Sequence, residues 1–213
     1  MLTVHRFQVN MFGVNTYVVS DPETREAMII DPGMVTDAEE ESIASYIDSN
    51  NLSVRHIVNT HLHLDHSFGN GRASRRWQLT PAANPADLPL GRQLPQQARM
   101  FGIPGNFEAV EQIIPLDSAT RLSLGHEVIT VIETPGHTPG GISLYAPESG
   151  ILFSGDTLFN GGIGRTDLPG GNHSQLIDSI RNRIIKLPPA TIVYPGHGPA
   201  TTIGAEESTN PYF

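Results

Sequence analysis

The chain has 213 residues, enough for a sizeable core, and we expect residues 1–213 to form a single domain. A net charge of −9 argues against a nucleic-acid partner, because binding phosphates requires a basic patch, and the absence of cysteine excludes disulfides and thiolate chemistry. No apolar stretch approaches the ~18 residues of a membrane span, and the start MLTVHRFQVN lacks signal-peptide features, so we expect a cytoplasmic protein without a membrane partner.

The first half of the chain reads as short strands in alternation with two helices. Two runs rich in β-branched residues flank the turn at 21–24 (DPET), which favours an antiparallel pair of strands. Thr36 and Glu39 match a capping box, so we expect a helix to begin there. The predicted elements are strands at 2–9, 16–20, 27–30 and 54–58 and helices at 36–50 and 71–78.

The second half begins with an irregular segment and continues mainly in strands. Residues 81–105 are rich in Pro, Gly and Gln, show little periodicity and contain one candidate helical piece around 93–101. Because long insertions are often binding loops, we expect this one to border a pocket, with a plain surface excursion as the alternative. The further predicted elements are strands at 113–116, 121–124, 127–133, 151–153 and 192–194 and a helix at 174–186.

Four side chains able to bind a metal lie within six consecutive positions of the segment THLHLDH. They are His61, His63, Asp65 and His66. In an extended segment alternate residues point the same way, so the first three would share one face while His66 turns to the other, as two neighbouring ions require. Imidazole and carboxylate suit zinc, with iron or manganese as alternatives. The competing interpretation is a polar loop whose histidines only make hydrogen bonds.

Three further candidate ligands follow apolar strands in glycine-containing turns. They are His137 in TPGHTPGG, Asp156 in SGDTLF and His197 in YPGHGP. Ligand sites in α/β sheets gather beyond strand ends, and glycine lets the backbone come close to what is bound. We therefore expect these three residues to join the cluster at 61–66.

One arrangement uses all seven candidates. It places His61, His63 and His137 on a first metal, Asp65, His66 and His197 on a second, and Asp156 as a bridge between them. Three protein ligands per ion leave positions open for water and substrate, which is typical of a catalytic site. Metal-bound water titrates near neutral pH, so no protein base is required, although we expect Asp65 to orient the nucleophile.

Other residues are candidates for supporting roles. Asp31 follows a strand end in IIDPG, where we expect it to support a ligand histidine, with turn formation as the alternative. Phe12 lies in the loop NMFGVN, which either covers a pocket or is an ordinary turn. His173, beside Gly170 and Gly171, is a candidate substrate contact, with a structural role as the alternative.

Five segments taken together resemble one known superfamily. They are THLHLDH, TPGHTPGG, SGDTLF, GGIGRTDLPGG and YPGHGP, starting at residue 60 and ending with the turn around His197. The pattern is similar to that of the metallo-β-lactamase-fold hydrolases and, within them, the glyoxalase II-like group. The resemblance implies an α/β fold, a four-layer αββα sandwich with a dinuclear site at one edge, and agrees with the metal assignments above. We add Arg165 of the IGRTD stretch as a candidate substrate contact.

Two departures from the family pattern narrow the expected function. Metallo-β-lactamases proper usually replace the aspartate at Asp156 with cysteine and lack a histidine at the position of His66, so we do not expect antibiotic hydrolysis. Only residues 198–213 follow His197, whereas full-length glyoxalase II enzymes continue into a helical domain that helps to hold glutathione. The resemblance is therefore to the short, single-domain relatives.

The hypothesis from the sequence is a hydrolase with two divalent metal ions and a small-molecule substrate. Zinc is the first choice of metal, and a metal-bridging hydroxide would attack a thiolester of the hydroxyacylglutathione type. The main alternative is a persulfide dioxygenase that uses one iron at the positions of His61, His137 and Asp156. A lactonase comes third, and a metal-stabilised scaffold without activity is the non-enzymatic alternative.

Overall fold

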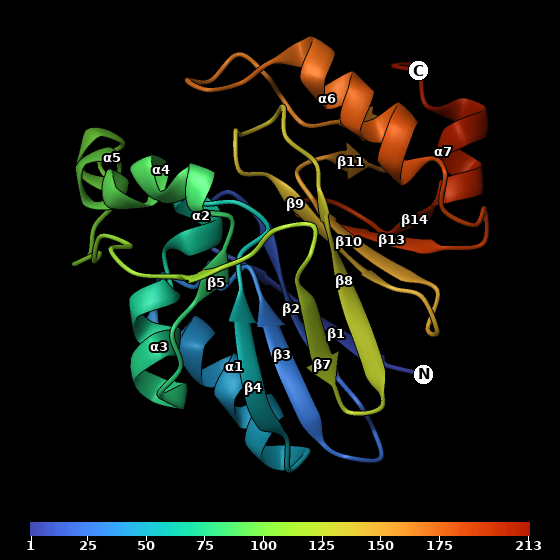
Figure 1. Cartoon of the computed structure of the whole chain (residues 1–213). Helices are drawn as coiled ribbons and strands as arrows, with labels where there is room; N and C mark the ends of the chain where they lie inside the picture. Colours follow the sequence, from blue (N-terminus) through green and yellow to red (C-terminus); the bar gives the residue numbers. More distant parts are fainter.

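Two six-stranded sheets pack face to face in the computed structural model, which describes residues 1–213 (Figure 1). The first sheet comprises β1 (Thr3–Val9), β2 (Val14–Ser20), β3 (Glu26–Ile30), β4 (Ser53–Val58), β5 (Ala82–Ala83) and β6 (Ile114–Pro115), which neighbour one another in this order. The first three strands are antiparallel, whereas β4 pairs with β3 in parallel. A parallel pair needs a crossover connection, which here is the helix α1 (Asp37–Ser49).

The second sheet has the strand order β14-β13-β10-β9-β8-β7. Its strands are β7 (Arg121–Leu124), β8 (Glu127–Glu133), β9 (Ile142–Ala146), β10 (Ile151–Gly155), β13 (Ile192–Pro195) and β14 (Thr201–Thr202). A small ribbon of β11 (Leu158–Phe159) and β12 (Gly162–Ile163) follows β10. The parallel pair of β10 and β13 is again joined by a helical crossover, made of α6 (His173–Ser179) and a π-helical turn at Ile180–Ile184.

The main hydrophobic core lies between the two sheets. Tyr17 and Met28 point into it from the first sheet, and Leu144 and Phe153 meet them from the second. Phe153 packs against Tyr17 with ring centroids 5.3 Å apart. Burying apolar area of this kind contributes roughly 25 cal/mol per Å², so the contact between the sheets is a main source of stability.

Helices cover the outer face of each sheet. On the first sheet, α1 and α3 (Asn70–Trp77) bury Ile43, Ile47 and Ala73. On the second, the π-helical turn and α7 (Ile203–Thr209) bury Ile184 and Ile203. The result is the four-layer αββα sandwich expected from the sequence (Figure 1). None of these helices combines the length and apolar character needed to cross a bilayer.

The segment 81–105 is more helical than the sequence indicated. It contains a 3-10 turn at Pro85–Asp87, α4 (Leu88–Arg92) and α5 (Leu94–Met100). Both α-helices carry proline in the first turn, where its missing N–H costs nothing and its fixed φ suits the helix. Leu94 and Ala98 pack against Phe68, so a small hydrophobic cluster holds α5 to the rest of the fold.

Two expectations about local structure were incomplete or wrong. The strand β9 and the C-terminal helix α7 were not among the predicted elements. The segment THLHLDH is not extended throughout, because the short helix α2 (Leu64–Ser67) begins immediately after His63. Asp65 therefore does not share a face with His61 and His63, and the helical turn directs it toward His66 and His197 instead.

The N-terminus of α1 provides a test of the local contacts that fix where this helix begins. Thr36 Oγ1 accepts a hydrogen bond from Glu39 N, and Glu39 Oε2 accepts one from Thr36 N at 2.9 Å. We expect Thr36→Ala to lower the free energy of unfolding by about 1 kcal/mol, because it removes one half of this capping box. Urea denaturation measures the change. Thr36→Ser is the control that keeps the hydroxyl, and a loss as large as that of the alanine variant would contradict the capping explanation.

Candidate metal centre

The ends of four strands bring all seven candidate ligands to one place. The ligands come from the segment after β4 and the adjoining α2 (His61, His63, Asp65 and His66), from the β8–β9 loop (His137), and from the turns after β10 (Asp156) and β13 (His197). The first sheet thus contributes four ligands and the second sheet three. The centre is therefore complete only when the two sheets are packed together.

The donor atoms form two groups of three. In the first group, His61, His63 and His137 have donor atoms that all lie within 4.8 Å of one another. In the second, Asp65 Oδ2 lies 3.3 Å from His197 Nε2, and His66 Nε2 lies 3.3 Å from the same nitrogen. Groups of three such donors could each hold one metal ion with a coordination position left open.

Asp156 lies between the two groups. Its Oδ2 is 3.5 Å from His137 Nε2 of the first group and 3.6 Å from His197 Nε2 of the second. Its Oδ1 is 3.4 Å from His66 Nε2. The carboxylate therefore has the position that a bridging ligand requires.

One buried carboxylate, Asp31, fixes the orientation of two histidines. His66 Nδ1 lies 3.0 Å from Asp31 Oδ2 and donates to it. Thr60 Oγ1 also donates to Asp31 Oδ2, at 2.7 Å, and so accepts from His61 Nδ1 at 3.1 Å. Both rings then carry their proton on Nδ1 and direct the Nε2 lone pair inward, the tautomer that metal binding needs. Asp31 thus has the supporting position expected from the sequence.

Two of the inner donor atoms lack hydrogen-bond partners within the protein. His137 Nδ1 donates to the backbone oxygen of Arg165 at 2.7 Å, so its Nε2 lone pair faces His63 Nδ1 at 2.9 Å. His61 Nε2 and Asp156 Oδ1 are buried without any hydrogen-bond partner. Buried polar atoms are rarely left unsatisfied, and these lie where the donor groups converge. The donor set therefore fits bound cations better than a network of hydrogen bonds.

Burial and charge shift the pKa values of these histidines in opposite directions. Burial lowers the pKa of His61 well below its ordinary value and that of His63 to about 3. Burial alone would also lower the pKa of His66, but the neighbouring carboxylates, led by Asp156 and Asp65, outweigh it and raise the pKa to about 10. His61 and His63 of the first group are thus neutral imidazoles, and the second group attracts positive charge. Binding a metal at the second group would release a proton.

Two glycines allow the turns after β10 and β13 to approach each other. Gly155 has a φ of +51°, in the left-handed region, and a Cβ there would lie 2.4 Å from Thr60 Oγ1. At Gly196 a Cβ would lie 2.2 Å from Asp156 Oδ1. The backbone N–H of Gly196 donates to the oxygen of Gly155 at 2.8 Å. Larger residues at these two positions would push the ligand turns apart.

Asp87 is a supporting residue that the sequence did not reveal. It is fully buried and accepts hydrogen bonds from Leu62 N at 3.1 Å, Thr138 Oγ1 at 2.8 Å and Gly140 N at 2.6 Å. Leu62 lies between two ligands of the first group, and Thr138 directly follows the third. Asp87 therefore joins the two ligand loops, although it lies in the irregular segment where no motif marks it.

A cavity of about 470 Å³ opens over the centre. His63, Asp65, His137, Asp156 and His197 line its floor, and Phe12, Phe101 and Leu168 contribute to its apolar walls. Phe12 thus borders the pocket, as one of the two interpretations of its loop proposed. The segment 81–105 borders it through Phe101, as expected.

The two other candidate substrate contacts have different positions. Arg165 lines the cavity, but its guanidinium is exposed and makes two hydrogen bonds of 2.7 Å to Asp167. His173 does not line the cavity and is exposed at the start of α6. Asn172 caps that helix, and its backbone N–H donates to the oxygen of Gly136, which fixes where the helix begins. The expectation that His173 contacts substrate is therefore not supported by its position.

Asp31 offers a test of how the centre is held. Its φ of +51° is tolerated by Asn as well as Asp, so Asp31→Asn should keep the backbone while removing the charge that faces His66. We expect metal affinity to fall by roughly 10- to 100-fold, the usual effect of losing such a supporting carboxylate. Competition with a chromophoric chelator measures the affinity. Asp21→Asn alters another buried aspartate, outside the centre, and an equal loss in that control would contradict a specific role for Asp31.

Comparisons with known proteins agree with this geometry. The family model described as "Metallo-beta-lactamase superfamily" matches residues 9–197. The chain is 34% identical to the hydroxyacylglutathione hydrolase GloC of Haemophilus influenzae, with 100% of the chain and 98% of that relative aligned.

Two solved structures are also similar over the whole chain. The di-iron-bound form of TTHA1623 has a TM-score of 0.87 and 34% identity, and the alignment covers 99% of this chain and 100% of that one. The BLEG-1 B3 metallo-beta-lactamase has a TM-score of 0.85 and 33% identity, with 100% and 99% covered. The family match, the sequence identity and the fold lead to one conclusion. The chain belongs to the metallo-beta-lactamase superfamily.

Proposed function

We propose that this protein is a dinuclear metal-dependent hydrolase that cleaves thiolesters of the hydroxyacylglutathione type. The observation that carries the proposal is the pair of three-donor groups facing one cavity, with the Asp156 carboxylate between them. A structural metal site is normally closed by four protein ligands, whereas each of these groups leaves room for water and substrate. The activity named for the Haemophilus influenzae relative supports the choice of substrate class.

The donor set determines which metals are suitable. His61, His63 and His137 would hold one ion, and the second group, with its carboxylate, would hold the other. Zinc is our first choice, while iron is supported by the di-iron form of TTHA1623, and manganese suits the oxygen ligands. When bound, two such ions activate water at neutral pH and polarise the acyl carbonyl of the substrate.

In this proposal, Asp65 orients the attacking water. Burial would raise its pKa, but the neighbouring His66 and His197 outweigh burial and hold the pKa well below its ordinary value. The carboxylate is therefore ionised at neutral pH and can accept a hydrogen bond from water at the floor of the cavity. Because a thiolate is a good leaving group, the reaction needs no strong protein acid, and none of the cavity residues has to supply one.

The competing function is a persulfide dioxygenase with a single iron at His61, His137 and Asp156. The distance of 3.5 Å between Asp156 Oδ2 and His137 Nε2 is compatible with it. That function leaves the second group of donors without a role, which is why we prefer the hydrolase. Lactone hydrolysis would use the same centre and is distinguished only by the substrate.

A charge-removing variant tests the role of Asp65. We expect Asp65→Asn to lower kcat on S-lactoylglutathione by at least about 100-fold, because a neutral amide cannot replace the charged carboxylate that accepts a hydrogen bond from the attacking water. Thiolester absorbance follows the reaction with metal-loaded protein. Asp48→Asn, which changes an exposed carboxylate of α1, is the control.

A β-lactam serves as the comparison substrate, and turnover of it in place of thiolesters would refute the proposal.

Metal content separates the two functions before any substrate is tried. Elemental analysis of the purified protein should give about two divalent ions per chain, and His197→Ala should lower this to about one. Chelation should remove both ions and lower the melting temperature, since a ligand that binds only the folded state stabilises it. A single iron per chain, with oxygen consumption on glutathione persulfide, would instead establish the dioxygenase.

A further inference from the structure

A second cavity adjoins the one over the metal centre. This side pocket has a volume of about 300 Å³, and its wall shares His63, Leu64, Phe101 and Leu168 with the catalytic cavity. One of the shared residues, His63, is itself a candidate metal ligand. A substrate whose reacting carbonyl lies at the centre could therefore extend one arm across Leu64 into the side pocket.

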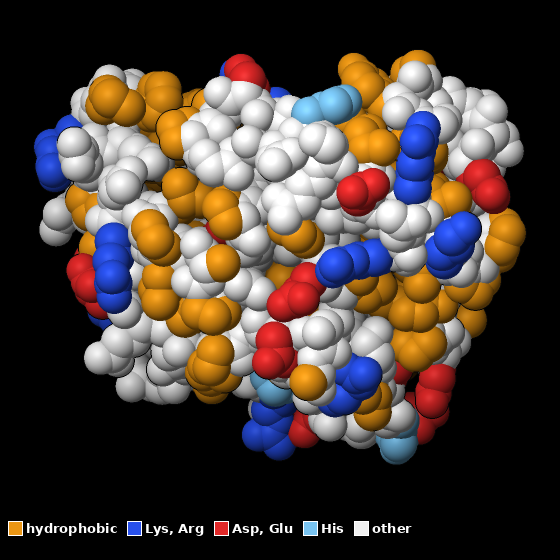
Figure 2. Space-filling model, turned by 45° about the horizontal axis from the view of Figure 1, so that its top comes forward, with side chains coloured by type: hydrophobic (Ala, Val, Ile, Leu, Met, Phe, Trp, Pro, Cys, Tyr) orange, Lys and Arg blue, Asp and Glu red, His pale blue; other side chains and the backbone are white.

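The lining of the side pocket is apolar with amide groups and carries no formal charge. Leu90, Met100 and Pro169 add to its apolar surface, and the polar side chains are Gln93, Gln96 and Gln97 of the α5 region. Glutamine presents both an N–H donor and an oxygen acceptor, so it matches an amide in the ligand. Apolar side chains gather on the side of the molecule that carries α4 and α5 (Figure 2).

Neither of the adjoining cavities offers a free cation to a carboxylate. Arg165 is the one lysine or arginine that lines either of them, and Asp167 occupies its guanidinium with two hydrogen bonds. Burying an unpaired carboxylate in such a pocket is costly, and the net charge of −9 adds to the repulsion. The side pocket therefore favours an uncharged arm over an anionic one.

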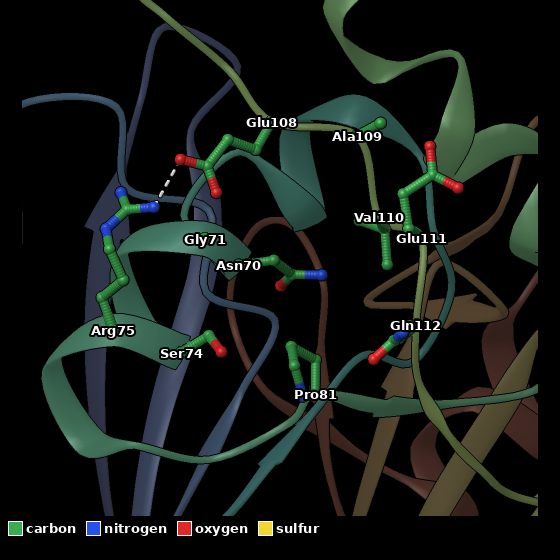
Figure 3. A pocket seen from close by; sticks show the side chains of 10 residues that line it. All are labelled: Asn70, Gly71, Ser74, Arg75, Pro81, Glu108, Ala109, Val110, Glu111 and Gln112. Carbon is green, nitrogen blue, oxygen red and sulfur yellow. Dashed lines mark hydrogen bonds and ion pairs between the residues drawn. The ribbon is translucent and has the colours of Figure 1, made fainter.

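A third pocket has the opposite character. It is lined by Arg75, Glu108 and Glu111 among others, with Arg75 paired to Glu108, and it lies between α3 and the segment 108–112 (Figure 3). It shares no lining residue with the catalytic cavity. A substrate arm that starts at the metal centre can therefore extend into the side pocket more directly than into this third pocket.

We propose that the side pocket binds one arm of the thiolester substrate, an uncharged chain that carries an amide group and an apolar end. This inference rests on the proposed thiolesterase function and narrows its substrate to a thiol carrier less anionic than glutathione, both ends of which carry a carboxylate. It assigns specificity to Gln97 and Met100 of α5, which line the side pocket and not the catalytic cavity. It also explains why an insertion rich in glutamine lies beside the centre.

Three acetyl thiolesters test the proposal with the metal-loaded protein. S-acetyl-N-butyrylcysteamine has the amide and an apolar end, S-acetyl-N-succinylcysteamine ends in a carboxylate at the same length, and S-ethyl thioacetate has no arm. We expect kcat/KM for the butyryl probe to exceed that of each of the others by at least about tenfold, because an apolar pocket discriminates on this scale. Equal values for the butyryl and succinyl probes, or for the butyryl probe and the armless one, would overturn the proposal.

Variants of α5 test whether residues of the side pocket cause the preference for the butyryl probe. Met100→Ala and Gln97→Ala should each lower kcat/KM for the butyryl probe at least about fivefold more than for S-ethyl thioacetate, since only the former has an arm to lose contacts. Met100 is largely exposed, so its replacement should not disturb folding. Arg99 lies on the same helix but outside the pocket lining, so Arg99→Ala should change kcat/KM for neither probe. Equal losses on both probes would overturn the assignment.

A binding measurement separates this inference from the thiolesterase proposal. The thioether analogue of the butyryl probe cannot be hydrolysed, and calorimetry measures its affinity for the metal-loaded protein. Binding that Met100→Ala weakens, without turnover of any thiolester, would support the side pocket and refute the thiolesterase. Turnover of thiolesters without detectable binding of the thioether would refute the side pocket and leave the thiolesterase standing.

Discussion

The structure depends on holding the donor atoms of seven side chains, drawn from both sheets, together in one largely buried place. In the first group, His63 Nδ1 lies 2.9 Å from His137 Nε2, and burial together with the neighbouring histidines keeps His61 neutral. In the second group, the Asp65 carboxylate attracts the imidazoles of His66 and His197. Burying so many polar donor atoms costs desolvation free energy, which a bound cation would offset.

The surrounding fold provides the constraint through two buried carboxylates and two glycine turns. Asp31 fixes His66 directly and His61 through Thr60, while Asp87 joins the loops on either side of the first group. Because the ligands come from both sheets, the interface between the sheets, filled by residues such as Phe153, also determines the geometry of the centre. A site supported in this way is preorganised for its ligand and does not have to be assembled by it.

The sequence revealed the ligands better than their surroundings. The candidate ligands could be found because they lie in short motifs after apolar strands, and Asp31 because it follows a strand end. Asp87 and the side pocket could not be found, since they depend on how the segment 81–105 folds back onto the centre. The same motifs could not show that α2 starts after His63, because a single helical turn leaves too short a pattern to distinguish from an extended segment.

Each of the two donor groups is proposed to hold one metal ion, with Asp156 shared by both. Anomalous X-ray diffraction from crystals of the metal-loaded protein tests it most directly. We expect two anomalous peaks roughly 3.5–4 Å apart, the usual separation in two-metal sites, one beside His61, His63 and His137 and one beside Asp65, His66 and His197. A single peak, bound only by His61, His137 and Asp156, would contradict it.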